Sequence, residues 1–167
     1  MNLMSPAFDF SEQIPKIHTG DGEDCSPALQ WENAPEETKS FVLIMDDPDA
    51  PVGTWVHWVL YDLPATLTEL PQGVPKTEAG PGGSSHGVCW GVDKFERVGY
   101  HGPLPPPGRP HRYFFKLYAL NRILGLKPRA TKAQLLAAFS GHVVTEATLM
   151  GTYQRASIGK TLEPNRP

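Results

Sequence analysis

Two histidines and two aspartates in this chain lie at the ends or on the faces of expected strands, and side chains of these types could bind a small ion. Asp47 and Asp49 directly follow an apolar run, in a turn that contains two prolines. His57 lies in the next apolar run, and His111 opens a third. Imidazoles suit a phosphate or a carboxylate, whereas carboxylates suit an ammonium group or orient a histidine. This mixture predicts a site for a small anionic or zwitterionic molecule.

A rigid segment rich in glycine and proline immediately precedes His111. Four of the five residues from 103 to 107 are proline, and proline fixes φ, so we expect a stiff rim beside the site. Gly102 and Gly108 flank this run. Because glycine has no Cβ, its backbone can approach a ligand closely. The loop is therefore predicted to direct N–H groups at an anion.

Three apolar runs must position these side chains. Residues 40–46, 54–63 and 111–120 are rich in β-branched and aromatic residues, which favours strands. Both faces of the second run are apolar, so it is predicted to be a central strand with His57 largely buried. If side chains alternate strictly along this strand, His57 lies on the same face as Trp55, Val59 and Tyr61. Neighbouring strands would line one pocket, with an aromatic wall predicted from Trp55, Tyr113 and Phe115.

The rest of the chain is predicted to contain many loops and few helices. Residues 64–110 are rich in glycine and proline and are expected to be mostly loop. Thr131 and Gln134 have the spacing of a capping box, which predicts a helix that ends near Gly141. A second helical stretch is predicted for residues 144–150. With 18 prolines and 16 glycines in 167 residues, the composition argues against a helical bundle.

Length and charge restrict the class of protein. A chain of 167 residues fits one domain, here taken as residues 1–167. The net charge is −3 and the 15 basic residues are scattered, so no nucleic-acid partner is expected. Apolar runs are far shorter than the ~20 residues of a membrane-spanning helix, and the first residues lack a signal-peptide pattern. These features predict a cytoplasmic protein without stable membrane insertion, whose Cys25 and Cys89 are reduced thiols.

The ordered set of motifs resembles the phosphatidylethanolamine-binding protein family, in its bacterial and archaeal Raf-kinase-inhibitor-like branch. The motifs that carry the resemblance are Asp47-Pro48-Asp49-Ala50-Pro51, Trp55-Val56-His57-Trp58, Gly99-Tyr100-His101-Gly102-Pro103-Leu104-Pro105-Pro106 and His111-Arg112-Tyr113. Supporting segments are residues 26–31, 141–143 and 151–155. Each motif alone is weak, but together, in the family's order, they span nearly the whole chain.

The resemblance implies a fold, a site and partners. The implied fold is mainly β: a large, mostly antiparallel sheet, a smaller second sheet and a few flanking helices. The implied ligand-binding residues are Asp47, Asp49, His57, Gly102, Pro103, His111 and Tyr113. The family also implies phosphorylated or carboxylate ligands, lipid head groups among them, protein partners such as kinases or proteases, and a homodimer. Many prokaryotic members have cysteine where this chain has Leu104, so thiol chemistry at the rim is not expected.

Three classes of function follow from these residues. The first is a binding module for a small anion or a phosphorylated head group. The second is a hydrolase or metal-dependent enzyme, because His57, His111 and an aspartate could hold a metal or transfer protons; no HExxH, GxSxG or P-loop motif accompanies them. The third is an inhibitor that acts through surface loops. Binding without a cofactor or a transition metal is the leading prediction, because donors from the loop suit an anion better than a cation.

Overall fold

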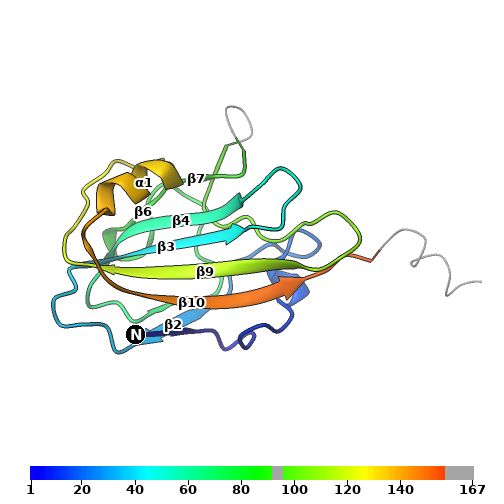
Figure 1. Ribbon diagram of the computed structural model, residues 1–167, viewed down its shortest axis with the longest axis horizontal. Coiled ribbons are helices and arrows are strands. Elements are labelled where there is room, and N and C mark those ends of the chain that lie inside the picture. Colours follow the sequence, from blue (N-terminus) through cyan, green and yellow to red (C-terminus); the bar gives the residue numbers. More distant parts are fainter. Residues whose placement is uncertain (92–95, 157–167) are drawn as a thin grey trace, which may run out of the picture.

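The centre of the molecule is an antiparallel sheet with the strand order β10-β9-β3-β4-β6. The computed structural model describes residues 1–91 and 96–156 (Figure 1). Three long strands match the predicted apolar runs: β3 (Ser40–Asp47), β4 (Trp55–Pro64) and β9 (His111–Leu120). The edge strands are β10 (Val143–Tyr153) and β6 (Ser85–His86). The predicted mainly β, antiparallel architecture is therefore confirmed.

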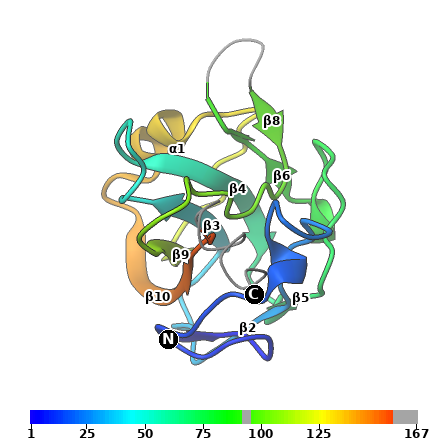
Figure 2. The ribbon, with the colours of Figure 1, turned by 90° about the vertical axis from the view of Figure 1, so that its right-hand side faces the viewer.

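Smaller elements cover the two faces of this sheet. A second sheet has the order β1-β2-β5, and β7 pairs with β8. These strands are β1 (Asn2–Met4), β2 (Leu29–Glu32), β5 (Glu69–Leu70), β7 (Val88–Cys89) and β8 (Arg97–Val98). The helices within residues 1–91 and 96–156 are α1 (Lys132–Phe139) and two 3-10 turns, η1 (Lys16–His18) and η2 (Pro81–Gly83). Figure 2 shows α1 on one side of the main sheet and β2 with β5 on the other. Among the described residues, no helix has the length and apolarity needed to cross a membrane.

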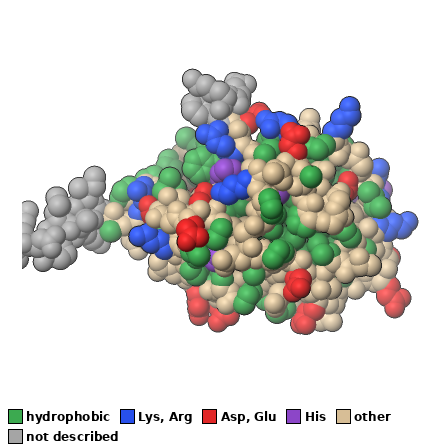
Figure 3. Space-filling view, turned by 180° about the vertical axis from the view of Figure 1, so that it is seen from behind, with side chains coloured by type: hydrophobic (Ala, Val, Ile, Leu, Met, Phe, Trp, Pro, Cys, Tyr) green, Lys and Arg blue, Asp and Glu red, His purple; other side chains and the backbone are tan. Residues whose placement is uncertain are grey.

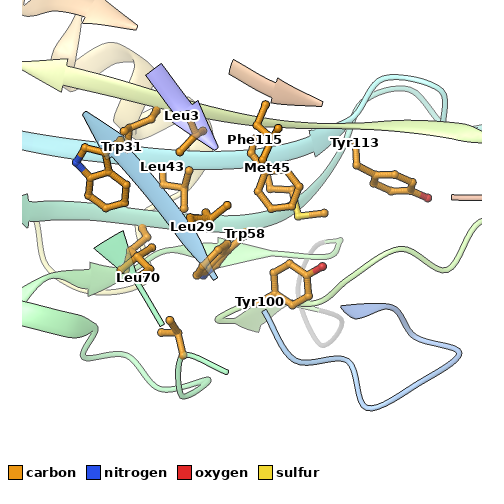
Figure 4. Packing of buried hydrophobic residues seen from close by; sticks show 14 of the residues in the cluster. Leu3, Leu29, Trp31, Leu43, Met45, Trp58, Leu70, Tyr100, Tyr113 and Phe115 are labelled. Atoms are coloured by element: carbon orange, nitrogen blue, oxygen red, sulfur yellow. The ribbon is translucent and has the colours of Figure 1, made fainter. Parts of the chain in front are cut away.

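Two hydrophobic clusters hold these layers together. The larger lies between the main sheet and the β1-β2-β5 sheet and includes Trp31, Trp58 and Tyr100 (Figure 4). The smaller lies under α1 and includes Leu135 and Phe139. Burial of a large apolar side chain contributes about 1.5–3 kcal/mol to stability, so these clusters supply the main driving force for folding. Strands β3 and β4 are thus covered on both faces, as their apolar sequences predicted.

The segment predicted as a second helix, residues 144–150, is part of strand β10, so that prediction was wrong. Strand β10 pairs with β9, beginning with Val143 opposite Leu120 and ending with Tyr153 opposite His111. The prediction followed the helix formers of the segment, Glu, Ala, Leu and Met, although its Val and Thr residues favour a strand, and pairing with β9 decides the outcome. The capping box at Thr131 is present as predicted, and Gln134 completes it.

The N-terminal segment covers part of the outer edge of β10. Ser11 donates its N–H to the carbonyl of Met150, at 2.7 Å. Ile14 donates to the carbonyl of Thr152 at 2.8 Å, and Thr152 donates to the carbonyl of Glu12 at 2.9 Å. Backbone groups that an edge strand would leave unpaired are thereby satisfied near the end of β10.

Cys25 and Cys89 are both free thiols. Cys89 is buried and its thiol donates to the carbonyl of Gly99. Burial raises the pKa of the Cys89 thiol to about 12. A thiol that stays protonated is a poor nucleophile, so Cys89 is a packing residue.

Candidate functional site

His57 lies at a bulge in β4. In the β3–β4 ladder, Met45 pairs with Trp58 and Asp46 pairs with Val56, so His57 has no partner across the ladder. A bulge of this kind inserts one extra residue into a strand and changes the direction of the side chain there. The irregularity cannot be seen in the sequence of β4, because it depends on the register with β3.

The bulge also changes which side chains share a face. Val56 packs with Val59 and Tyr61 in the cluster under α1. Strict alternation had predicted His57, rather than Val56, on the face of Val59 and Tyr61, so that prediction was wrong. The ring of His57 instead lies 5.3 Å from the ring of Tyr113, measured between centroids. Tyr113 belongs to the larger cluster, on the opposite side of the sheet.

Two reciprocal hydrogen bonds join His57 to His101 in the proline-rich loop. His57 Nδ1 donates to the carbonyl of His101 at 2.6 Å, and the N–H of His101 donates to the carbonyl of His57 at 3.0 Å. The indole of Trp90 also donates to the His101 carbonyl. Because a carbonyl only accepts, the hydrogen of neutral His57 is assigned to Nδ1, which leaves Nε2 as an acceptor. Burial lowers the pKa of His57, so the neutral form is favoured.

His111 is oriented by Asp47. His111 Nδ1 lies 2.7 Å from Asp47 Oδ2, and both side chains are largely buried. The other carboxylate oxygen of Asp47 accepts the N–H of Asp49 at 2.7 Å. With both oxygens engaged, Asp47 acts as a positioning residue, and His111 Nε2 remains available to a ligand.

Asp49 serves the backbone of β9 rather than the pocket. Its carboxylate accepts hydrogen bonds at 2.9 Å from the backbone N–H, Nε and Nη2 of Arg112. Hydrogen bonding to the Arg112 side chain is the main reason why the pKa of Asp49 falls to about 2. Asp49 is thus anionic at neutral pH and fixes the start of β9, next to His111.

His57 and His111 line the same pocket, which has a volume of about 210 Å³. Its lining comprises Asp47, Ala50, Pro51, Val52, Trp55, His57, Trp90, Leu104, Pro105, Pro106, His111 and Tyr113. Burial, followed by the charge of Asp47 and a hydrogen bond to its carboxylate, raises the pKa of Tyr113, so its hydroxyl stays protonated. In Figure 4, Tyr113 lies at one end of the hydrophobic cluster and its hydroxyl points away from the other labelled residues. The pocket is polar at its base and apolar around its rim.

The proline-rich loop contributes differently from what the sequence predicted. The N–H of Gly102 donates to Asp24 Oδ1 at 2.7 Å, so it is not directed at the pocket. The carbonyl of Pro103 accepts from the backbone of Gly20. Neither Gly102 nor Pro103 is among the lining residues, and Phe115, which was predicted in the wall, lies in the core. The loop provides the apolar wall of the pocket through Leu104 and the two prolines that follow it.

Sequence reasoning missed Trp90. This residue lies in a loop, has a positive φ of 62° and packs edge-on against the rings of Trp55 and His57. A bulky residue with a positive φ is strained and marks a place where the surroundings enforce the conformation. The only sequence signal was an aromatic residue within a glycine-rich segment, which is too weak to identify a pocket wall.

Comparison with known proteins places these features in a family. Residues 4–154 match the family model described as phosphatidylethanolamine-binding protein. The chain belongs to the phosphatidylethanolamine-binding protein family. Relatives named UPF0098 protein occur in Aquifex aeolicus and Methanothermobacter thermautotrophicus. Both are 46% identical over 93% of this chain, and the matches cover 89% and 99% of those proteins.

Solved structures of family members have the same fold. YbcL of E. coli, described as a new member of the mammalian PEBP family, matches with a TM-score of 0.82 and 30% identity. That match covers 92% of this chain and 98% of YbcL. A PEBP homologue from Chlamydia trachomatis matches with a TM-score of 0.79 and 36% identity, over 92% and 97% of the two chains. Membership in the phosphatidylethanolamine-binding protein family therefore rests on sequence and on fold.

Proposed function

We propose that this member of the phosphatidylethanolamine-binding protein family binds small anions, above all phosphate monoesters such as phosphorylated head groups. The observation that carries the proposal is the pairing of His57 with His101 and of His111 with Asp47. Both imidazoles are held through Nδ1. Each therefore presents Nε2 to one pocket, which Tyr113 also lines. A protonated His111, beside the Asp47 carboxylate, donates from Nε2 to a phosphate oxygen, whereas Nε2 of neutral His57 accepts from the hydroxyl of a monoprotonated phosphate. Three polar groups at the base of a small pocket can surround one phosphate.

The apolar rim suits the remainder of such a ligand. Val52 and Leu104 line the pocket and are 79% and 40% exposed. Trp55 and Trp90 line it as well. An ester carbon attached to the phosphate would contact this rim, which a free inorganic anion cannot do.

No specific observation favours the enzymatic alternative over binding. The lining of the pocket contains no serine, threonine or cysteine. Within residues 1–91 and 96–156, no group of three or more His, Cys, Asp or Glu side chains is arranged to hold a metal ion. A kinase or protease partner is likewise not specified by any described residue, so the proposal concerns the pocket alone.

Replacing His111 with alanine tests this proposal. A hydrogen bond to a charged group contributes roughly 1.5–3 kcal/mol, so we expect the affinity for phosphoethanolamine to fall at least about tenfold. The measurement is calorimetric titration at pH 5.5 and 7.5, with His142→Ala as a control at a histidine far from the pocket. Equal affinities of wild type and His111→Ala at both pH values would exclude this pocket as the anion site.

Asp47→Asn should shift the pH dependence of binding. The amide can still accept from His111 Nδ1, but it stabilises an imidazolium less than a carboxylate does. Anion binding should therefore move to lower pH, with a larger loss of affinity at pH 7.5 than at pH 5.5. The same titrations measure this ratio. A uniform loss at both pH values would mean that Asp47 contributes geometry without charge.

A further inference from the structure

A second hollow adjoins the anion pocket and shares His111 with it. This hollow, which we call the Arg109 groove, has a volume of about 440 Å³. It is lined by Asp49, Arg109, Pro110, His111, Arg112 and Thr152. Because His111 lies in both linings, a ligand held in the pocket is adjacent to the groove.

Arg109 supplies the uncompensated charge of this groove. Arg112 is paired with Asp49 at 2.9 Å, and His111 with Asp47 at 2.7 Å. Arg155, on the neighbouring C-terminal segment, is paired with Asp21 at 3.1 Å. Arg109 is exposed and forms no ion pair or hydrogen bond through its side chain with any residue of the described part of the chain. Among the described residues, the groove therefore presents one guanidinium without a partner, on a protein whose net charge is −3.

The backbone on both sides of Arg109 is fixed. The N–H of Gly108 donates to the carbonyl of Arg155 at 3.3 Å, and the amide of Gln154 donates to the carbonyl of Gly108. On the other side, Pro110 restricts Arg109 to an extended backbone. Arg109 is thus presented from a defined position beside the pocket, so that less conformational freedom is lost when it binds a ligand.

The charges on the face opposite to that of Figure 1 are dispersed. Figure 3 shows Lys and Arg side chains on this face, interspersed with acidic and apolar side chains. Arg109, which has no partner among the described residues, lies beside a pocket with two histidines and suits a second acidic group on the same ligand. Guanidinium groups bind carboxylate and phosphate through two parallel hydrogen bonds.

We propose that Arg109 forms a second anion subsite, so that the protein selects phosphate monoesters that carry a further acidic group. This inference rests on the proposed function, because it assigns the phosphate to the pocket between His57 and His111. The second group, a carboxylate or another phosphate, lies in the Arg109 groove. A small phosphorylated acid and an acidic phosphopeptide share this chemistry.

Phosphoethanolamine and O-phosphoserine provide a matched pair of probes, because they differ by one carboxylate. We expect wild-type protein to bind O-phosphoserine about three- to tenfold more tightly at low ionic strength, as for one partly exposed charge pair. In Arg109→Gln this ratio should fall to about one, while the affinity for phosphoethanolamine changes less than about twofold. Arg122→Gln, at an exposed arginine in another part of the chain, is the control and should keep the wild-type ratio.

A peptide arm distinguishes the two sources of ligand. Capped Asp-pSer-Asp is compared with capped Ala-pSer-Ala on wild type and Arg109→Gln. If only the preference for Asp-pSer-Asp over Ala-pSer-Ala depends on Arg109, the ligand is a phosphopeptide. If the preference for O-phosphoserine over phosphoethanolamine depends on Arg109, the ligand is a small acid. If phosphoethanolamine binds but Arg109→Gln changes neither the affinity ratio of the two small molecules nor that of the two peptides, the second subsite is wrong. The proposal that the pocket binds phosphate then still stands. If no phosphate ester binds, the proposed function fails, and the subsite fails with it.

Discussion

Replacing Gly102 with alanine is expected to destabilise the protein by about 3 kcal/mol, at the upper end of the usual cost of overpacking. A Cβ at this position would lie 2.2 Å from the backbone oxygen of His18 and 2.7 Å from Asp24 Oδ1. The first of these atoms belongs to the backbone, so it cannot turn aside. For a chain of this size, we expect the melting temperature to fall by roughly 10 °C, and phosphate binding to weaken because the loop that carries the pocket wall is displaced.

Leu104→Ala is the matched control for Gly102→Ala. It changes an exposed side chain in the same loop and introduces no clash. Chemical denaturation of both variants measures the effect, and we expect Leu104→Ala to lose less than about 1 kcal/mol. A Gly102→Ala protein as stable as wild type would show that the loop is not seated against His18 as described.

Acid is expected to destabilise the protein steeply below about pH 6.5, before most carboxylates titrate. Burial lowers the pKa of His57, His86 and His101 relative to the ordinary value. The unfolded chain therefore binds more protons than the folded one as the pH falls below 6.5, and stability falls with it. Each such histidine contributes up to about 1.4 kcal/mol per pH unit.

His86 provides the structural reason for this behaviour. Its Nε2 lies 3.0 Å from the indole nitrogen of Trp58, which can only donate, and its Nδ1 lies 2.6 Å from the carbonyl of Thr77. A second proton on the ring must break the bond to Trp58. His86→Asn should lower the free energy of unfolding at pH 7.5 and flatten its decline between pH 6.5 and 5.5. Denaturation at three pH values measures both, and an unchanged slope would contradict the assignment.

The long strands could be predicted from the sequence because their apolar runs are local signals. Strand β10 was missed: it contains helix formers at positions 146, 147, 149 and 150, but its two valines and three threonines favour a strand, and pairing with β9 decides between the two. The bulge at His57 depends on the register between two strands, which alternation within one strand does not reveal. Register of this kind is set by the whole sheet.

The site was predictable in its residue types and less so in its geometry. Although the direction of His57 depends on the bulge in β4, the positions of Asp47 and His111 follow from strand ends that the sequence displays. The role of Gly102 does not, because the carboxylate that binds its N–H belongs to Asp24, 78 positions away along the chain. Glycine is needed there for close contact with protein backbone rather than with a ligand.

The hydrogen bonds between residues 11–14 and β10 have a consequence for how the protein behaves when its N-terminus is disturbed. A strand edge with unpaired N–H and C=O groups is a template on which a second chain can pair. Proteolytic removal of the first fifteen residues would uncover such an edge at Met150 and Thr152 and would also remove Phe8 and Ile14 from the core. The N-terminal segment thus protects the end of β10 against intermolecular assembly, and aggregation after limited digestion would be its visible sign.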